Sequence, residues 1–271
     1  MRTIVVALLV GALLAPGTVA AKSANSVFDP PLDAQKRVLP AAKNAAKATL
    51  TCSYYPHFMV KQIDEGEVGA AQLSIVPGEA AHKPACQRAN LPAEKVIDVK
   101  DWSGYFKGVK GDYVFFDAGD GVNGASGFAV FAAADAKKLL EDSALGDLKS
   151  AALDGAALTL RYRRSFSADC SVPHDGAGCW TKIAAATGLD AHAQPDCAAG
   201  YLKAKNELAK GRCEAQGKST AACLAAALKE IDAQRWDEAP SVVVYDAETV
   251  LQPGQSATKP LGGDLACHSS D

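Results

Sequence analysis

The sequence lacks most of the motifs by which enzymes and metalloproteins are recognised. It contains no C-x-x-C pair, which weakens the case for a thioredoxin-like redox site or a common zinc knuckle. Its five histidines form no H-E-x-x-H or H-x-H pattern. In the segment 123–127 (NGASG) the glycines flank Ser126 at the wrong spacing for a nucleophile elbow. The sequence therefore indicates no cofactor and no metal site.

Long apolar runs and a strong charge of one sign are also missing after Ala21. A membrane-spanning helix needs roughly 20 consecutive apolar residues, so we expect no transmembrane segment in the rest of the chain. The net charge is −3, and it becomes −4 when Arg2 is removed with the N-terminal segment. A charge this mild argues against nucleic acid or an anionic membrane as the partner.

The start of the chain has the pattern of a secretory signal peptide. Arg2 gives a short positive region, residues 4–14 are apolar, and a Pro-Gly break precedes the small residues at 18–20 (TVA). The apolar region is too short for an uncleaved membrane anchor. We predict that residues 1–20 are removed, and that a soluble mature protein beginning near Ala21 is exported to the periplasm or secreted.

All eight cysteines lie in this mature chain, and an even number in an exported protein predicts disulfide bonds. Residues that allow the chain to reverse lie between the third and fourth cysteines, and also between the sixth and seventh. The first two cysteines lie beside strand ends or turns, and the remaining two would join the chain's tail to the start of a helical segment. The predicted pairs are Cys52–Cys86, Cys170–Cys179, Cys197–Cys267 and Cys213–Cys223.

Composition divides the mature chain near residue 50. Residues 21–50 are rich in Ala and Lys and have almost no large apolar face, which predicts a linker or a loosely held helix. In residues 51–271, short apolar or alternating runs are bounded by Gly and Pro, as in a single β-rich domain. We expect a mainly antiparallel meander forming a sandwich or a barrel-like sheet. The period then changes, and residues 196–238 are predicted to form a two-helix insertion.

Three local patterns give sharper expectations. Asp154-Gly155 predicts a two-residue hairpin turn, followed by a strand whose apolar residues alternate with arginines. Residues 117–127 (DAGDGVNGASG) predict a loop. Residues 132–145 fit either a helix or a tight hairpin, and the short strands on both sides favour the hairpin.

The segment 168–180 (ADCSVPHDGAGCW) resembles a site of chemistry more than any other part of the chain. Cys170, His174, Asp175 and Cys179 could hold a metal ion, or a cysteine could act as a nucleophile beside His174. Both interpretations need reduced thiols in an oxidising compartment. A disulfide closing a loop of turn-forming residues is therefore the favoured interpretation.

The other candidate sites also have simpler structural explanations. Asp117, Asp120 and Asn123 are spaced somewhat like calcium ligands, but glycines occupy two ligand positions, so a solvated turn is favoured. The aromatic residues and His57 of segment 53–58 (SYYPHF) could line a ligand pocket, although aromatics mostly serve packing. Arg161 and Arg163 could receive an acidic partner, or they could form a solvated sheet face.

These observations favour an exported, disulfide-stabilised, non-catalytic protein of the bacterial envelope. Its role would be binding or inhibition, with an unknown envelope protein or glycan as partner. The alternative is a periplasmic hydrolase acting on envelope material, with a site drawn from His57, Asp101, Asp117 and Asp120. A pocket containing two carboxylates, or a histidine with a serine or cysteine, would favour the hydrolase.

Overall fold

The computed structural model describes residues 26–40, 47–122, 124–218, 220–233 and 236–269. The predicted signal peptide at residues 1–20 lies outside the described residues. Within these ranges no helix is both long enough and apolar enough to cross a bilayer.

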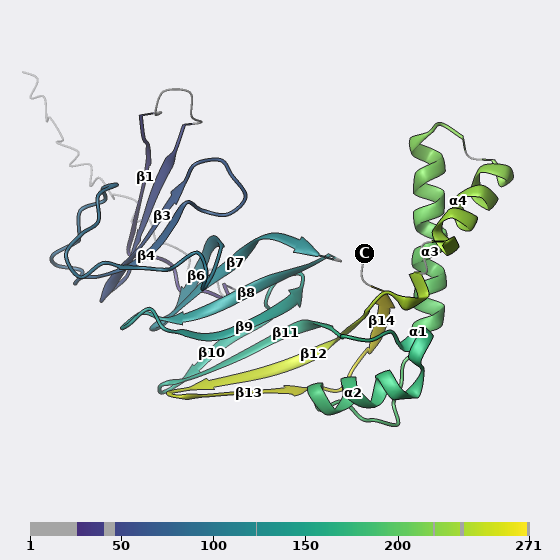
Figure 1. Ribbon diagram of the computed structural model, residues 1–271. Coiled ribbons are helices and arrows are strands. Elements are labelled where there is room, and N and C mark those ends of the chain that lie inside the picture. Colours follow the sequence, from purple (N-terminus) through teal and green to yellow (C-terminus); the bar gives the residue numbers. More distant parts are fainter. Residues whose placement is uncertain (1–25, 41–46, 123, 219, 234–235, 270–271) are drawn as a thin grey trace, which may run out of the picture.

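A small antiparallel sheet is formed by the N-terminal part of the chain (Figure 1). Its strands follow one another in sequence order, so each pairs with its chain neighbours and the sheet is a simple meander. Its strands are β1 (Asp33–Val38), β2 (Thr49–Tyr54), β3 (Phe58–Asp64), β4 (Gln72–Pro77) and β5 (Lys95–Val96).

A larger antiparallel sheet of nine strands follows. The long strands β11 and β12 pair near one side of it: β9 and β10 share one edge of β11, while β13 and β14 share the outer edge of β12. The predicted class, mainly antiparallel β, is confirmed. The strands are β6 (Gly104–Lys110), β7 (Tyr113–Val122), β8 (Ala125–Ala132), β9 (Lys138–Leu145), β10 (Ser150–Asp154), β11 (Ala157–Ser167), β12 (Ser241–Gln252), β13 (Gln255–Pro260) and β14 (Ala266–Ser269).

The helices lie between β11 and β12 in sequence and at one end of the large sheet in space (Figure 1). Asp196 begins the longest of them, because its side chain accepts a hydrogen bond from the Ala199 N–H at 2.9 Å. The late two-helix insertion is thus confirmed as α3 and α4. The helices are α1 (Val172–Asp175), α2 (Ala177–Thr187), α3 (Cys197–Ala215), α4 (Ala221–Ala233) and the 3-10 helix η1 (Trp236–Glu238).

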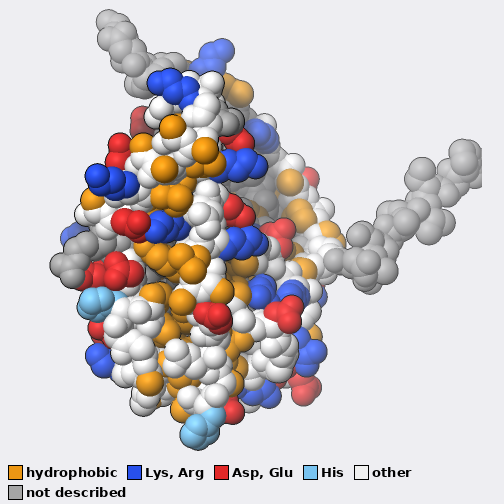
Figure 2. Space-filling model, turned by 90° about the vertical axis from the view of Figure 1, so that its right-hand side faces the viewer, with side chains coloured by type: hydrophobic (Ala, Val, Ile, Leu, Met, Phe, Trp, Pro, Cys, Tyr) orange, Lys and Arg blue, Asp and Glu red, His pale blue; other side chains and the backbone are white. Residues whose placement is uncertain are grey.

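The helical hairpin of α3 and α4 has a small core of its own, separate from those of the sheets. Ala209, Cys213, Ala227 and Ile231 are buried in it. Figure 2 views the molecule from this helical end and shows apolar side chains in a band flanked by charged ones. The far part of the hairpin therefore packs on itself, while its foot packs against α1 and β14.

Two large cores, together with a smaller one formed by the small sheet around Cys52 and Cys86, hold the rest of the molecule together. One lies between the sheets, where Phe58 and Ile75 of the small sheet belong to the same cluster as Phe116 and Phe131 of the large one. The other lies on the opposite face of the large sheet, where Trp180 packs with residues from β7, β8, β11 and β12. Strands β7 and β8 alternate between these two cores, which explains their short apolar runs.

Part of the segment interpreted as a linker or loosely held helix, residues 21–50, is a strand. Residues 33–38 form β1, which pairs along its whole length with β2. Its side chains are mostly exposed, so it is held by backbone pairing more than by apolar burial, and a hydrophobic pattern could not reveal it. Residues 41–46 of the same segment lie outside the described residues.

The predicted loop at 117–127 is also wrong, because β7 continues to Val122 and β8 begins at Ala125. Its glycines serve close approach of backbones rather than a loop. A side chain on Gly119 would lie 2.8 Å from the Gly69 backbone nitrogen, and one on Gly121 would lie 2.6 Å from the Ala125 carbonyl oxygen. Asn123 lies outside the described residues.

Two other local predictions can be compared directly with the structure. Residues 132–145 form the end of β8, a turn and β9, as the favoured hairpin interpretation predicts. The hairpin predicted at Asp154-Gly155 exists, but its loop is shifted by one residue to 155–156, since Asp154 pairs with Ala157. Gly155 adopts a φ of +57°, which a glycine accommodates without steric cost.

Candidate binding groove

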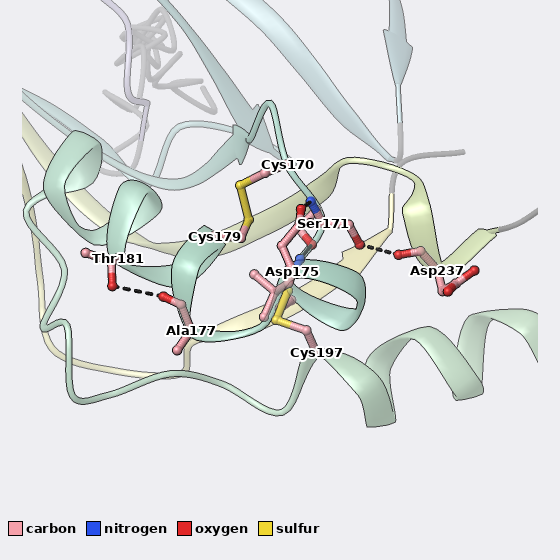
Figure 3. The surroundings of a disulfide bond; sticks show 11 residues. Cys170, Ser171, Asp175, Ala177, Cys179, Thr181, Cys197 and Asp237 are labelled. Atoms are coloured by element: carbon pink, nitrogen blue, oxygen red, sulfur yellow. Dashed lines mark hydrogen bonds between the residues drawn. A yellow bond between two sulfur atoms is a disulfide. The ribbon is translucent and has the colours of Figure 1, made fainter.

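The segment 168–180 is a stapled helical turn rather than a metal site. Cys170 and Cys179 form a disulfide with Cα atoms 5.7 Å apart (Figure 3). Asp175 lies close to both sulfurs, but its carboxylate accepts a hydrogen bond from the Ser171 N–H at 3.0 Å. The sulfurs are bonded to each other, so neither is available as a thiolate ligand or nucleophile.

The same segment is anchored to the chain that follows the helical hairpin. The Ser171 hydroxyl donates to the Asp237 carbonyl oxygen (Figure 3), and the Val172 N–H donates to the Ser241 hydroxyl at 2.8 Å. These bonds fix the point where the chain leaves β11 and the point where it returns to β12. The segment therefore serves to position α1 and α2.

The candidate hydrolase residues are not brought together. Asp117 lies on β7 and accepts a hydrogen bond from Lys107 at 2.8 Å, while Asp120 is exposed further along the same strand. Asp101 is exposed in the turn before β6, and His57 is exposed in the turn between β2 and β3. The eight cysteines are all in disulfides, so none is available as a nucleophile.

The aromatic segment 53–58 and the arginines of β11 serve structure, as their simpler interpretations predicted. Tyr55 and Phe58 of the aromatic segment stack in the core between the sheets, with ring centroids 5.3 Å apart. Arg161 and Arg163 lie on the exposed face of β11, where they pair with Glu248 at 2.8 Å and Asp246 at 3.6 Å. The arginines thus belong to a cross-strand ladder of ion pairs on the sheet surface.

Arg164, on the opposite face of β11, belongs to a mostly buried polar cluster that sequence reasoning missed. Its guanidinium donates to Asp142 at 2.9 Å and to the Tyr245 hydroxyl at 2.8 Å, and the Tyr162 hydroxyl donates to the same aspartate at 2.6 Å. Burial, with the nearby Asp142 charge, raises the pKa of Tyr162. The charges and hydroxyls bond to one another, so the cluster stabilises the junction of β9, β11 and β12.

A groove of about 420 Å³ lies at the other end of the large sheet, away from the helices. Four hairpin turns form it, those joining β6 to β7, β8 to β9, β10 to β11 and β12 to β13; we call it the turn-end groove. Its lining is rich in alanine and glycine. The lining residues are Gly111, Asp112, Tyr113, Ala132, Ala133, Ala134, Asp135, Lys137, Leu139, Leu153, Gly155, Ala156, Gln252, Pro253 and Gly254.

Specific contacts hold the walls of the turn-end groove in place. The Tyr113 hydroxyl donates to the Ala156 carbonyl oxygen at 2.6 Å, which joins two of the turns. Leu153 leans over Gly111, where a side chain in place of the glycine hydrogen would lie 2.7 Å from the Leu153 Cδ1. Ala136, in the turn between β8 and β9, has a φ of +56°, a conformation that is strained for alanine. The groove is thus preformed by the ends of paired strands.

A second hollow of about 270 Å³ adjoins the groove and shares Asp112, Ala133 and Ala134 with it. His57, Phe58 and Pro77 complete its lining. His57 is therefore the one residue of the hydrolase hypothesis that lies beside the groove. No hydrogen bond joins its imidazole to Asp112 among the described residues, so the two do not form an acid–base pair here.

A few polar side chains also line the groove, namely Asp112, Asp135, Lys137 and Gln252. The Asp135 carboxylate accepts a hydrogen bond from the Lys137 N–H at 3.1 Å, and Lys95 donates to the Ala134 carbonyl oxygen at 2.8 Å. Burial of the ring raises the pKa of Tyr113, so this phenol stays neutral at physiological pH. A mostly apolar lining with a few polar groups is typical of binding sites for apolar groups of a ligand.

Sequence reasoning did not find this groove because its lining residues come from turns far apart in the chain. The signals available were turn residues, such as Gly111, Gly155 and Gly254, and these mark hairpins anywhere. In comparisons with known proteins, no family model, no curated protein and no solved structure matches the chain.

Proposed function

We propose that this is an exported, soluble, non-catalytic binding protein of the bacterial envelope. It would hold an apolar part of an envelope protein in the turn-end groove. The observation that carries the proposal is the groove itself, a preformed hollow of about 420 Å³ with small apolar lining. This volume falls in the usual range for ligand sites, about 300–1,000 Å³.

Export is supported by the disulfides and by the signal-peptide pattern at the start of the chain. Four disulfides join all eight cysteines, and such bonds persist in oxidising compartments. They also fit a binding role, because a stapled scaffold keeps its surface rigid and loses little entropy when a partner binds. A glycan is a less suitable occupant because Tyr113 is the single aromatic residue lining the groove in the part of the chain that the structure describes.

The experiment compares matched leucine variants of the tagged mature protein in pull-downs from envelope extract. Leu153→Asp places a charge in the groove, while Leu202→Asp places the same charge on α3; the two leucines are 41% and 52% exposed. We expect the groove variant to lose a captured protein that wild type and the α3 variant both retain. Equal capture by all three proteins would contradict the proposal.

The hydrolase alternative stays a hypothesis, because no contact among the described residues supports it. His57 and Asp112 share a hollow, but they belong to different turns and no hydrogen bond links them among the described residues. A groove without a positioned nucleophile–base pair favours binding over turnover.

A further inference from the structure

We propose that the free edge of β1 binds β1 of a second copy of this chain. The two strands would run antiparallel, with each Gln35 opposite the partner's Gln35, and would join the small sheets of two molecules into one continuous sheet. The inference goes beyond the proposed binding role and does not depend on it.

The outer edge of β1 is open in the part of the chain that the structure describes. β1 is the first strand of its sheet and pairs with β2 alone. Leu32 and Val38, at its two ends, are 57% and 67% exposed and rank among the most exposed large apolar residues of the chain. An exposed edge strand with apolar ends is a template for pairing with another strand.

The hydrogen-bonding direction of β1 can be read from its neighbours. The Leu39 N–H donates to the Ala48 carbonyl oxygen, in the same register as the strand itself. Because backbone groups alternate in direction along a strand, odd-numbered residues of β1 direct theirs to β2 and even-numbered residues direct theirs outward. The Ala34 N–H agrees with this, since it bonds to the carboxylate of its neighbour Asp33 at 2.8 Å rather than to β2.

One register satisfies both the hydrogen bonds and the side chains. With Gln35 on the two-fold axis, the outward-facing Ala34 pairs with the partner's Lys36, so the strands exchange backbone hydrogen bonds. Asp33 then lies opposite the partner's Arg37, and Leu32 lies opposite the partner's Val38. Each molecule supplies both halves of these pairs, so two ion pairs and two apolar pairs form.

Four contacts within each chain bear on this pairing. The Ala34 N–H donates to the Asp33 carboxylate at 2.8 Å and the Arg37 guanidinium donates to the Gln35 side-chain oxygen at 3.2 Å, and the dimer would exchange both bonds for contacts with the partner molecule. The Leu32 N–H already donates to the Tyr54 carbonyl oxygen at 2.8 Å, so Leu32 contributes its side chain to the interface rather than its N–H. Asp33 pairs with Lys83 at 3.0 Å, and these two side chains are 40% and 43% exposed. The carboxylate is open enough to accept a second cation, the guanidinium of the partner molecule.

The strands could also pair in neighbouring registers that form the same kind of backbone hydrogen bonds, but those registers do not place opposite charges and apolar residues against each other. Sliding by one step in one direction places Lys36 opposite the partner's Lys36, which is a like-charge pair. Sliding in the other direction places Asp33 opposite the partner's Gln35 and leaves Arg37 without an acidic neighbour. The segment 32–38 (LDAQKRV) is therefore complementary to its own reversal, and this identifies a second copy as the partner.

The test is sedimentation equilibrium of the mature protein over a wide range of concentration. Some variants are expected to weaken the dimer and others to preserve it. Arg37→Asp places like charges opposite each other, and we expect the dimer to weaken by about tenfold or more. The double variant Asp33→Arg/Arg37→Asp exchanges the two charges and should restore it. Lys203→Asp, with the same change in charge on an exposed residue of α3, is the matched control and should dimerise like wild type.

Lys36→Pro removes an outward N–H that β2 does not use, so it should abolish the dimer while circular dichroism shows the β fold intact. Concentration-dependent dimers of wild type and the control, lost in Arg37→Asp and Lys36→Pro and recovered in the double variant, support the proposal. A wild-type protein that stays monomeric at every concentration overturns it. A dimer that neither single variant weakens also overturns it.

Discussion

A buried ion pair shows what single residues contribute to this fold. Lys61, in the middle of β3, lies 2.5 Å from Glu94, and neither side chain is more than 1% exposed. The Leu91 N–H and the Gln72 amide also donate to the glutamate, at 2.7 and 2.9 Å. The two charges are thus desolvated together and hydrogen-bonded, which is the arrangement that burial of a charge requires.

The pair could not be predicted from the sequence. Lys61 follows three apolar residues in β3, where a lysine normally indicates the solvent face, and Glu94 belongs to a distant loop. Only the fold shows that this loop covers the lysine. The disulfide partners, in contrast, could be predicted. Two pairs close short loops of turn-forming residues, and the other two follow from strand ends and from the position of the chain's tail.

Glu94→Gln should destabilise the protein by about 3–5 kcal/mol, because it leaves the Lys61 charge buried without its partner. The double variant Lys61→Met/Glu94→Gln should recover much of this loss, since no unpaired charge remains. Urea unfolding of the oxidised protein measures both changes. A loss below about 1 kcal/mol in Glu94→Gln would mean that the pair is hydrated and contributes little.

The same pair predicts a dependence on pH. Burial by itself would raise the pKa of Glu94, but hydrogen bonds from Lys61 and the Leu91 backbone outweigh it, and the pKa lies below its ordinary value of 4.5. The unfolded state therefore binds this proton more tightly than the folded state. Its stabilising contribution is complete above the unfolded pKa and is lost as the pH falls through the folded pKa, so Glu94→Gln should flatten that part of the stability profile.

Among the secondary-structure elements, periodicity predicted those with a buried face and missed those without one. α4 and the alternating strand β11 bury apolar residues at regular spacing, and the sequence indicated both. β1 buries little, and the second half of β7 consists of glycines and aspartates that pair closely with neighbouring backbones. Such elements depend on partners, which local pattern does not show.

The helical hairpin should be dispensable for the fold of the sheets. Replacing residues 202–233 with a short Gly-rich linker removes the hairpin's own core but keeps Cys197, Tyr201 and η1, which contact the rest of the protein. Changing the length of a surface connection alters its closure entropy only slowly, so we expect the β signature and a cooperative transition to remain. Circular dichroism and thermal unfolding measure both.

An unfolded product of this deletion would contradict the separation of the two cores. A control that replaces the single residue Leu202 with Gly keeps the hairpin and tests whether the foot of α3 alone is sensitive. If the deleted protein folds, loss of an envelope partner by it would move the binding site from the turn-end groove to the hairpin.

For the molecule as a whole, the sequence predicted the class, the late helices and all four cysteine pairs that the structure contains. It left open whether the strands form a sandwich of two sheets or one barrel-like sheet, and it did not predict that four turns converge on one groove. Both depend on contacts between residues far apart in the chain. The binding role therefore relies on the groove, and the compartment relies on the disulfides and the N-terminal signal-peptide pattern.

The central claim is that this is an exported, fully oxidised binding protein. Its compartment and redox state are tested most directly by intact-mass analysis of the chain recovered from the cell envelope or medium. We expect a mass that begins near Ala21 and is lower by two hydrogens for each of four disulfides. Alkylation without reduction should add nothing. A chain that retains Met1, is found in the cytoplasm and takes up alkylating reagent would contradict the account.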